Sequence, residues 1–423
     1  MRLVTEAAWV AGSAAVAGLG VALVDVGKAG QVTWAAAVVF LAFGCCLAGL
    51  VAAVRRWAPG AGSFLLWPTA LLVALGLVLI YRVEPVEASI QVWWIVAAIV
   101  AAIGILPAFR GGVKRLLPLG YWLAGSGLGL IVLPFLPRLM GGGSESSHGL
   151  WLTIRWGNAS FMAQPFGLGA VLLAVGLAGI HSRWALEPLS DRADSRLASN
   201  RDPLVMGAVW VTVLPFLWAT GDLTAWAVLL ALSATTAYAA TGDGRVVWTG
   251  LALLGVGVVA GLASSRVSET LQVWLDPFSA GEAGAGLKES LLALGSGHLS
   301  GSGLGMGEPE LVPRATSDWI LAALGEELGL AGTAAVIGLY GLVTAAGIGI
   351  SIGSRDLFSK VAAAGLSFLL CLMFIGTAGG LQRLLPPTDM GLPFLAYGGI
   401  PMMAGWLALA LLVRISHEEQ GPL

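Results

Sequence analysis

Residues 287–332 read LKESLLALGSGHLSGSGLGMGEPELVPRATSDWILAALGEELGLAG. A polar, glycine-rich segment runs here into one aspartate, Asp318, which we expect to open an apolar helix that also carries Glu326 and Glu327. The rest of the chain is almost entirely apolar, and ionisable groups in membrane helices are costly and commonly functional. We therefore expect the chemistry of this chain to lie in this stretch.

The composition predicts a membrane protein. Of the 423 residues, 57% are hydrophobic and 11% are charged, whereas soluble domains carry about 25% charged residues. The net charge of -2 gives no sign of a nucleic-acid partner. The first apolar run lacks a small-residue cleavage site, which predicts a retained helix. The three cysteines lie inside apolar runs and suit helix packing better than disulfides or a metal site.

We predict an all-α polytopic membrane protein with about twelve transmembrane helices. Apolar runs of about 17–25 residues, the length that crosses a bilayer as a helix, recur along the whole sequence. They fall at 7–26, 32–53, 63–81, 92–108, 117–136, 162–181, 203–220, 223–240, 246–263, 330–351, 360–380 and 393–413.

The basic residues predict the orientation of these helices. If the N-terminus is cytoplasmic, 14 Lys and Arg residues fall on the inside and 8 on the outside, in agreement with the positive-inside rule. Both termini are then cytoplasmic. The outer face receives the two longest connections, at about 137–161 and 264–329.

Asp318 has two interpretations. In the first, Thr316 or Ser317 caps the helix and Asp318 complements the helix dipole in the first turn. In the second, Asp318 is a general base at the membrane surface, which requires that burial by neighbours such as Trp319 raise its pKa toward working pH. The residue pattern alone favours the first interpretation and excludes neither.

Other polar groups of this region are also ambiguous. At about 100° per residue, Glu326 and Glu327 cannot both share the helix face of Asp318; one is expected to line a polar cavity and the other to pair with a basic or backbone group. The glycine-rich run 295–307 is neither a Walker loop nor a dinucleotide fingerprint, and it fits a close-fitting loop beside a ligand or a plain surface loop. Asp222, between two apolar runs, is favoured as a helix N-cap.

Four of the eight basic residues on the outer face, which run against the usual bias, either bind anionic groups such as phosphates or contact lipid headgroups. They are Arg155, Lys288, Arg314 and Arg383. His148 and His298 are isolated loop histidines, which argues against metal ligation.

Several motifs of the sequence together resemble the SEDS family, the polytopic peptidoglycan polymerases that include FtsW, RodA and SpoVE. Between Trp274 and Glu419 the motifs are WLDPF, SLLALGSG, SGSGLGMG, VPRATSDWILAALGEELGLAG, LLPPTDMGLPFLAYGG and LLVRISHEE. The resemblance implies a ten-helix core over residues 55–423, with the extracytoplasmic loop 264–329, preceded by two additional transmembrane helices over residues 1–54.

The resemblance implies a peptidoglycan glycosyltransferase that polymerises lipid II at the outer face of the cytoplasmic membrane, in division, elongation or cell-shape control. Asp318 matches the family's essential aspartate and would take a proton from the acceptor sugar hydroxyl, while undecaprenyl pyrophosphate leaves from the donor glycan. Positive charge for the leaving group would come from Arg or Lys, or from a divalent cation such as Mg or Mn. The expected partners are a class B penicillin-binding protein and membrane lipids.

The resemblance also implies a set of substrate-binding residues around Asp318. They are Arg155, Gln164, Lys288, Glu289, Ser290, Arg314, Ser317, Glu326, Glu327, Arg383 and Tyr397. The sequence departs from the family pattern at several cavity positions; Trp151 stands where the family has Arg, and Asp389 where it has Gly. The chain is therefore expected to be a divergent member.

Two other functions remain open at this point. A scaffold with weak or no catalysis, which docks a partner transpeptidase, is suggested by the replaced cavity residues. A flippase for a lipid-linked precursor would need polar groups at several depths of the membrane, and few ionisable residues lie in the middle of the predicted helices.

Overall fold

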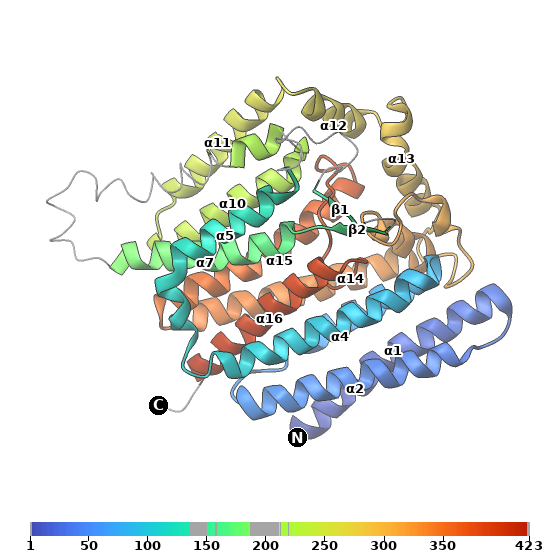
Figure 1. Cartoon of the computed structure of the whole chain (residues 1–423). Helices are drawn as coiled ribbons and strands as arrows, with labels where there is room; N and C mark the ends of the chain where they lie inside the picture. Colours follow the sequence, from blue (N-terminus) through green and yellow to red (C-terminus); the bar gives the residue numbers. More distant parts are fainter. Residues whose placement is uncertain are drawn as a thin grey trace, which may run out of the picture.

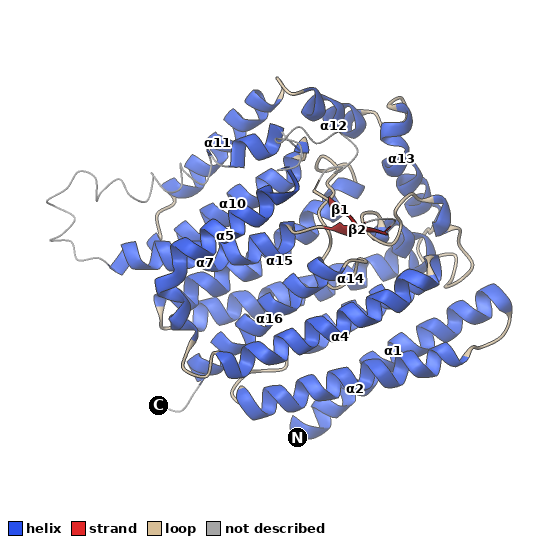
Figure 2. Cartoon of the chain, viewed as in Figure 1, coloured by secondary structure: helices blue, strands red, loops and turns tan. Residues whose placement is uncertain are grey.

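The computed structural model describes residues 2–135, 150–156, 159–186, 211, 213–218 and 220–420. It is a bundle of long α-helices (Figures 1 and 2). Its α-helices are α1 (Arg2–Ala29), α2 (Trp34–Trp57), α3 (Leu66–Val83), α4 (Pro85–Ala108), α5 (Gly120–Val132), α7 (Phe166–Leu186), α10 (Leu223–Thr241), α11 (Arg245–Gly261), α12 (Ser265–Leu275), α13 (Gly281–Ser296), α14 (Ile320–Gly353), α15 (Leu357–Leu381) and α16 (Gly399–Gln420). Short 3-10 helices are η1 (Val113–Leu119), η2 (Leu133–Phe135) and η3 (Pro309–Leu311).

The helices confirm the prediction of an all-α polytopic membrane protein. Within the described residues, 10 helices are long and apolar enough to cross a membrane, and α11 with α12 adds a pair bent by 103°. Of the predicted spans, all but one coincide with a described helix. The remaining span, 203–220, lies mostly outside the described residues, although residues 211, 213–218 and 220 are helical.

The two long connections contain regular structure. Strands β1 (Leu152–Trp156) and β2 (Ala159–Ala163) form an antiparallel hairpin in which Leu152 pairs with Ala163. The predicted loop 264–329 is largely helical, because it contains α12, α13 and the first turns of α14. With 11 and 16 residues, α12 and α13 are shorter than the about 20 residues that cross a bilayer as a helix. They lie along the surface of the bundle (Figure 1).

The two ends of the bundle are clearly different. Both termini lie at one end, whereas α12, α13 and the hairpin lie at the other (Figure 1). We call this second end the loop end; it also holds the segments 297–319 and 382–398, which connect α13 to α14 and α15 to α16.

Glycines inside the helices allow close packing. At the contact of α5 with α7, a Cβ added to Gly127 would lie 2.6 Å from the carbonyl oxygen of Gly169, and one added to Gly176 would lie 2.3 Å from the nitrogen of Ala124. These distances leave no room for a side chain. The close contact fixes α7, whose N-terminal end leads out of the hairpin at the loop end.

The start of α14 corrects the sequence interpretation. The helix begins at Ile320, its N-cap residue is Trp319, and no side chain caps it. Thr316 and Ser317 are therefore not the cap, and Asp318 precedes the helix instead of lying in its first turn. The helix also breaks at Gly329, where φ is 66° and ψ is -164°, a conformation open mainly to glycine.

Candidate active site

A tight turn places Asp318 at the loop end. Arg314 adopts a left-handed backbone conformation with φ 54°, which is uncommon for a residue with a side chain. Its carbonyl accepts hydrogen bonds from the N–H groups of Ser317 (3.1 Å) and Trp319 (3.4 Å). The turn is held from outside by Tyr397, whose N–H donates to the carbonyl of Thr316 at 2.8 Å. The backbone therefore brings the Arg314 side chain back toward Asp318.

Asp318 is a buried carboxylate beside one guanidinium. The residue is 3% exposed, and Nη1 of Arg314 lies 2.6 Å from its Oδ2. The N–H bonds of the guanidinium are not aligned with this oxygen, and within the described residues neither carboxylate oxygen accepts a hydrogen bond. Burial and the neighbouring charge of Asp389 raise the pKa of Asp318 to about 8, against the opposing effect of Arg314. The carboxyl group of Asp318 therefore has a pKa near neutral pH, in the range that a general base requires.

Asp389 and Asp222 complete an acidic cluster around Arg314. Nη2 of Arg314 lies 3.4 Å from Oδ1 of Asp389. Asp222 caps α10 by accepting the N–H of Ala225 at 2.8 Å, and it also accepts from the Thr388 hydroxyl (2.7 Å) and the Asp389 N–H (3.1 Å). Burial raises the pKa of Asp222 to about 6. The segment 382–398 is thus fixed to α10, with the Asp389 side chain directed at Arg314.

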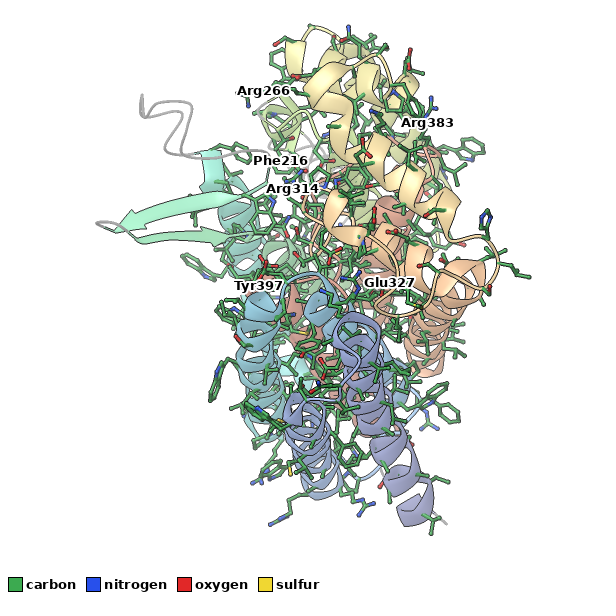
Figure 3. The ribbon with its side chains drawn as sticks, turned by 90° about the vertical axis from the view of Figure 1, so that its right-hand side faces the viewer. Phe216, Arg266, Arg314, Glu327, Arg383 and Tyr397 are labelled. Carbon is green, nitrogen blue, oxygen red and sulfur yellow. The ribbon has the colours of Figure 1, made fainter. Side chains whose placement is uncertain are left out.

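A polar cavity of about 520 Å³ opens beside this cluster. Asp222, Arg314 and Asp389 lie on its wall, and α12 and α13 form the opposite side with Arg266, Glu269 and Glu282. Trp319 also lines it, so Arg314 before Asp318 and Trp319 after it both reach the cavity. Figure 3 shows Arg266 and Arg314 at the same end of the bundle, the loop end.

An apolar groove adjoins the polar cavity. It has a volume of about 760 Å³ and lies between α10, α11, α12 and α15. Leu223 and Pro386 line the groove, while their chain neighbours Asp222 and Pro387 line the polar cavity. An acidic, arginine-containing cavity and a long apolar groove therefore meet at one end of the bundle.

Four of the predicted binding residues gather around Asp318. Arg314 contacts it directly, and Ser317 belongs to the same turn. Gln164, which is buried, donates from Nε2 to the carbonyl oxygen of Asp389. Tyr397 holds the turn through its backbone.

Three predicted residues on α13 are bonded to each other or to their own helix. Lys288 and Glu289 form an ion pair at 3.4 Å with half-exposed side chains. The Ser290 hydroxyl donates to the carbonyl of Gly286 at 2.6 Å. No contact joins these side chains to Asp318 within the described residues, and their role in substrate binding stays a prediction.

Glu326 and Glu327 hold the glycine-rich segment in place. Oε1 of Glu326 accepts the N–H of Glu308 at 2.8 Å, and the carbonyl oxygens of Glu326 and Glu327 accept the N–H groups of Ser302 and Gly303. The Glu327 carboxylate, fully buried, lies 2.5 Å from Nε of Arg82. One glutamate thus pairs with a basic residue and the other with backbone groups. The segment is a close-fitting loop, but it fits against α14 itself.

Arg383 lies away from Asp318, and the side chain of Arg155 lies outside the described part of the chain. Arg383 braces α12: its Nε donates to the carbonyl of Trp274 at 3.0 Å, and the Trp274 indole donates back to the Arg383 carbonyl at 3.0 Å. Figure 3 shows Arg383 apart from Arg314. Arg155 pairs with Ser160 in the hairpin through the backbone, and its side chain lies outside the described part of the chain. His148 also lies outside it.

Sequence reasoning missed two residues of the site. Asp222 is an N-cap, as predicted, but it is also bonded to the segment that carries Asp389. Asp389 stands out in the sequence as a departure from a family pattern, without a role. Asp222 lies at the start of α10 and Asp389 in the connection between α15 and α16, both on the predicted outer face with Asp318. This shared face is the signal that could have grouped them.

The described residues do not present a metal-ligand set. Among them, no group of three or more His, Cys, Asp or Glu side chains is arranged to hold a metal ion.

The fold and the cavity define a multi-pass membrane protein with an acidic, arginine-containing site at one end of its bundle. The chain belongs to the FtsW, RodA and SpoVE family, whose family model, described as cell cycle protein, matches residues 62–421. It is therefore a protein of the cytoplasmic membrane.

Curated relatives and solved structures agree with this assignment. The chain is 33% identical to the peptidoglycan glycosyltransferase RodA of Mycobacterium tuberculosis (strain ATCC 25618 / H37Rv), over 88% of this chain and 81% of the relative. It is 30% identical to RodA of Mycobacterium leprae (strain TN), over 95% and 88% of the two chains.

The fold matches two solved structures with lower sequence identity. A chain of the structure described as "Structural coordination of polymerization and crosslinking by a peptidoglycan synthase complex" gives a TM-score of 0.63 at 21% identity, over 85% of this chain and 98% of that chain. The rod shape determining protein RodA of Thermus thermophilus gives 0.57 at 20% identity, over 85% and 97%.

Proposed function

We propose that this chain is a peptidoglycan glycosyltransferase that polymerises lipid II, with Asp318 as its general base. Its relatives from Mycobacterium carry the name peptidoglycan glycosyltransferase. One observation carries the assignment of the base: Asp318 is buried beside a polar cavity, and its oxygens accept no hydrogen bond from the described residues. A carboxylate in this state can accept the proton of a hydroxyl.

In the proposed reaction, a hydroxyl of the acceptor sugar lies in the polar cavity. Asp318 takes its proton as the hydroxyl oxygen forms a bond to the anomeric carbon of the donor glycan. The bond between that carbon and the pyrophosphate oxygen breaks, and undecaprenyl pyrophosphate leaves with the electron pair. Because Arg314 covers Asp318 and its own side chain is 51% exposed, the hydroxyl reaches the base when this side chain moves aside.

The leaving pyrophosphate requires positive charge nearby. Arg266 and Arg314 both line the cavity, and guanidinium groups bind phosphate oxygens through paired N–H donors. The polyprenyl chain requires an apolar environment. The groove of about 760 Å³ that adjoins the polar cavity supplies one. A divalent cation, Mg or Mn, bound with the pyrophosphate is a further expectation, which chelation during the assay tests.

The proposed function implies an orientation of the bundle in the membrane. The loop end faces outward, where lipid II is polymerised, and both termini are cytoplasmic. The family model begins at residue 62, which supports the proposal that residues 1–54, with α1 and most of α2, are an addition to the core. A class B penicillin-binding protein is the proposed partner; a solved chain of the same fold belongs to a peptidoglycan synthase complex.

The experiment is polymerisation of purified lipid II by the purified chain in detergent, with and without divalent cation. The natural chain is expected to form glycan strands, and Asp318→Asn is expected to form none while it inserts in the membrane and elutes as a monodisperse protein. Asp243→Asn is the matched control, because Asp243 is exposed and pairs with Arg245 at the opposite end of the bundle.

The same variants separate the two alternatives. If the chain is a flippase, it should move labelled lipid II across the membrane of vesicles, and Asp318→Asn should still do so. A scaffold would retain a partner transpeptidase and normal cell shape in Asp318→Asn. Glycan strands formed by Asp318→Asn at the natural rate would refute the proposed function.

A further inference from the structure

Arg314 is shared between two carboxylates. Its Nη1 lies 2.6 Å from Asp318 and its Nη2 lies 3.4 Å from Asp389. A guanidinium that contacts one carboxylate through both of its terminal nitrogens binds it strongly. Such a pair lowers the pKa of the carboxylate, which stays ionised but becomes a weaker base. Here the second nitrogen is directed at Asp389, and Asp318 is left with a single, misaligned contact.

Asp389 is itself held firmly in the position that allows this. Its N–H donates to Asp222 at 3.1 Å, and its carbonyl accepts from the buried Gln164. Its side chain is 33% exposed at the cavity wall. The backbone on both sides is fixed, so the carboxylate has one arginine partner and open access to the cavity.

We propose that Asp389 is a positioning residue, which holds the second nitrogen of the Arg314 guanidinium away from Asp318 and so limits Arg314 to a single contact with the base. The inference rests on the proposed function, since it assigns Asp389 a role in the step that Asp318 catalyses. Asp389 also offers Arg314 a partner when the acceptor hydroxyl enters. It does not touch the reacting atoms, and it acts through Arg314 and through its own charge.

The charges around Asp318 decide the sign of the effect. Arg314 faces it from the preceding turn, Asp389 from the segment after α15, and Asp222 from the start of α10. The cavity wall adds three more charged groups, on α12 and α13: Arg266, Glu269 and Glu282. Asp389 raises the pKa of Asp318 and Arg314 lowers it. Loss of the Asp389 charge therefore lowers the pKa of Asp318 twice, directly and by freeing Arg314 to pair with it.

The test is the pH profile of polymerisation by Asp389→Asn, which keeps the size of the side chain and removes its charge. Because the base must be ionised, the acid limb of kcat is expected to move to lower pH by about one unit. The plateau of kcat at alkaline pH is expected to fall several-fold, because Asp318 is then a weaker base and Arg314 pairs with it more closely. Asp389→Glu, which restores the charge, is expected to return both values toward those of the natural chain.

A purely structural role of Asp389 would lower the plateau and leave the acid limb in place, and this result would overturn the inference. A shift of the limb to higher pH would also overturn it. Should Asp389→Asn fail to accumulate, Asp389→Gly makes the same removal of charge at a position without backbone strain. If the natural chain forms no glycan at any pH, the proposed function fails, and this outcome is distinct from an active chain whose limb does not move.

Discussion

The buried ion cluster at the loop end of α3 offers the sharpest prediction about stability. Arg82 is 3% exposed, and its guanidinium contacts Glu327, Glu310 and the carbonyl of Gly307. Arg82→Met removes all three contacts while it keeps most of the apolar side-chain volume. We expect it to destabilise the chain and to release the glycine-rich segment from α14.

The size of the effect follows from the burial of each partner. Glu310 is half exposed, so its ion pair contributes about 0–1 kcal/mol. The hydrogen bond to Gly307, at 2.6 Å, has a charged donor and contributes about 1.5–3 kcal/mol. Glu327 is fully buried, and removal of one partner of a buried ion pair costs about 3–5 kcal/mol. The loss should therefore be dominated by the stranded Glu327.

Thermal unfolding of the purified protein in detergent measures this loss, and limited proteolysis within 297–312 measures release of the segment. Arg245→Met is the control: Arg245 is 91% exposed and pairs with Asp243 at 3.3 Å, so its removal should change stability by less than about 0.5 kcal/mol. The double variant Arg82→Met, Glu327→Leu removes both charges and should be more stable than Arg82→Met alone.

Two results would contradict this reasoning. If Arg82→Met unfolded at the same temperature as the natural chain, the ion pair would make no net contribution to stability. A double variant less stable than Arg82→Met would show that the stranded carboxylate is not the source of the loss.

Three further predictions concern the site and its support. Arg314→Gln removes the positive charge beside Asp318 and so raises its pKa further; the acid limb of the polymerisation rate should move to higher pH, opposite to Asp389→Asn, and a limb that moves down contradicts this. Asp222→Ala loses the α10 cap and leaves the Thr388 hydroxyl without its acceptor; the loss of stability should be about 1–3 kcal/mol in a denaturation measurement. Gly27→Val places a Cβ 2.7 Å from the carbonyl oxygen of Leu304, so it should push α1 from the glycine-rich segment and increase cleavage there by protease.

The course of the helices was largely predictable from the sequence. Apolar length marks a membrane helix whatever its neighbours are, and the runs at 7–26 and 360–380 correspond to α1 and α15. The N-cap role of Asp222 was also predictable, since the cap bond to Ala225 is local. The start of α14 was not: Thr316 and Ser317 are good cap residues, but a turn built on the left-handed Arg314 and held by Tyr397 takes their place.

The partners of the site residues could not be predicted, because they come from distant parts of the chain. Asp389 meets Asp222 across 167 positions, and Arg82 meets Glu310 across 228. Hydropathy and periodicity tell which environment a residue prefers, but they do not tell which helices are neighbours. The same reason explains why Lys288 and Arg383, both basic and both on the predicted outer face, are bonded within α13 and to α12 and not to Asp318.

The measurement that tests the role of Asp318 most directly is the single-turnover rate of glycan bond formation, compared between the natural chain and Asp318→Asn at saturating lipid II. Loss of a general base should slow this step by about 10²–10⁴-fold at pH values above the pKa of Asp318, and by a smaller factor at lower pH, with binding of lipid II and thermal unfolding unchanged. A variant that forms the bond at close to the natural rate would contradict the assignment of Asp318 as the base.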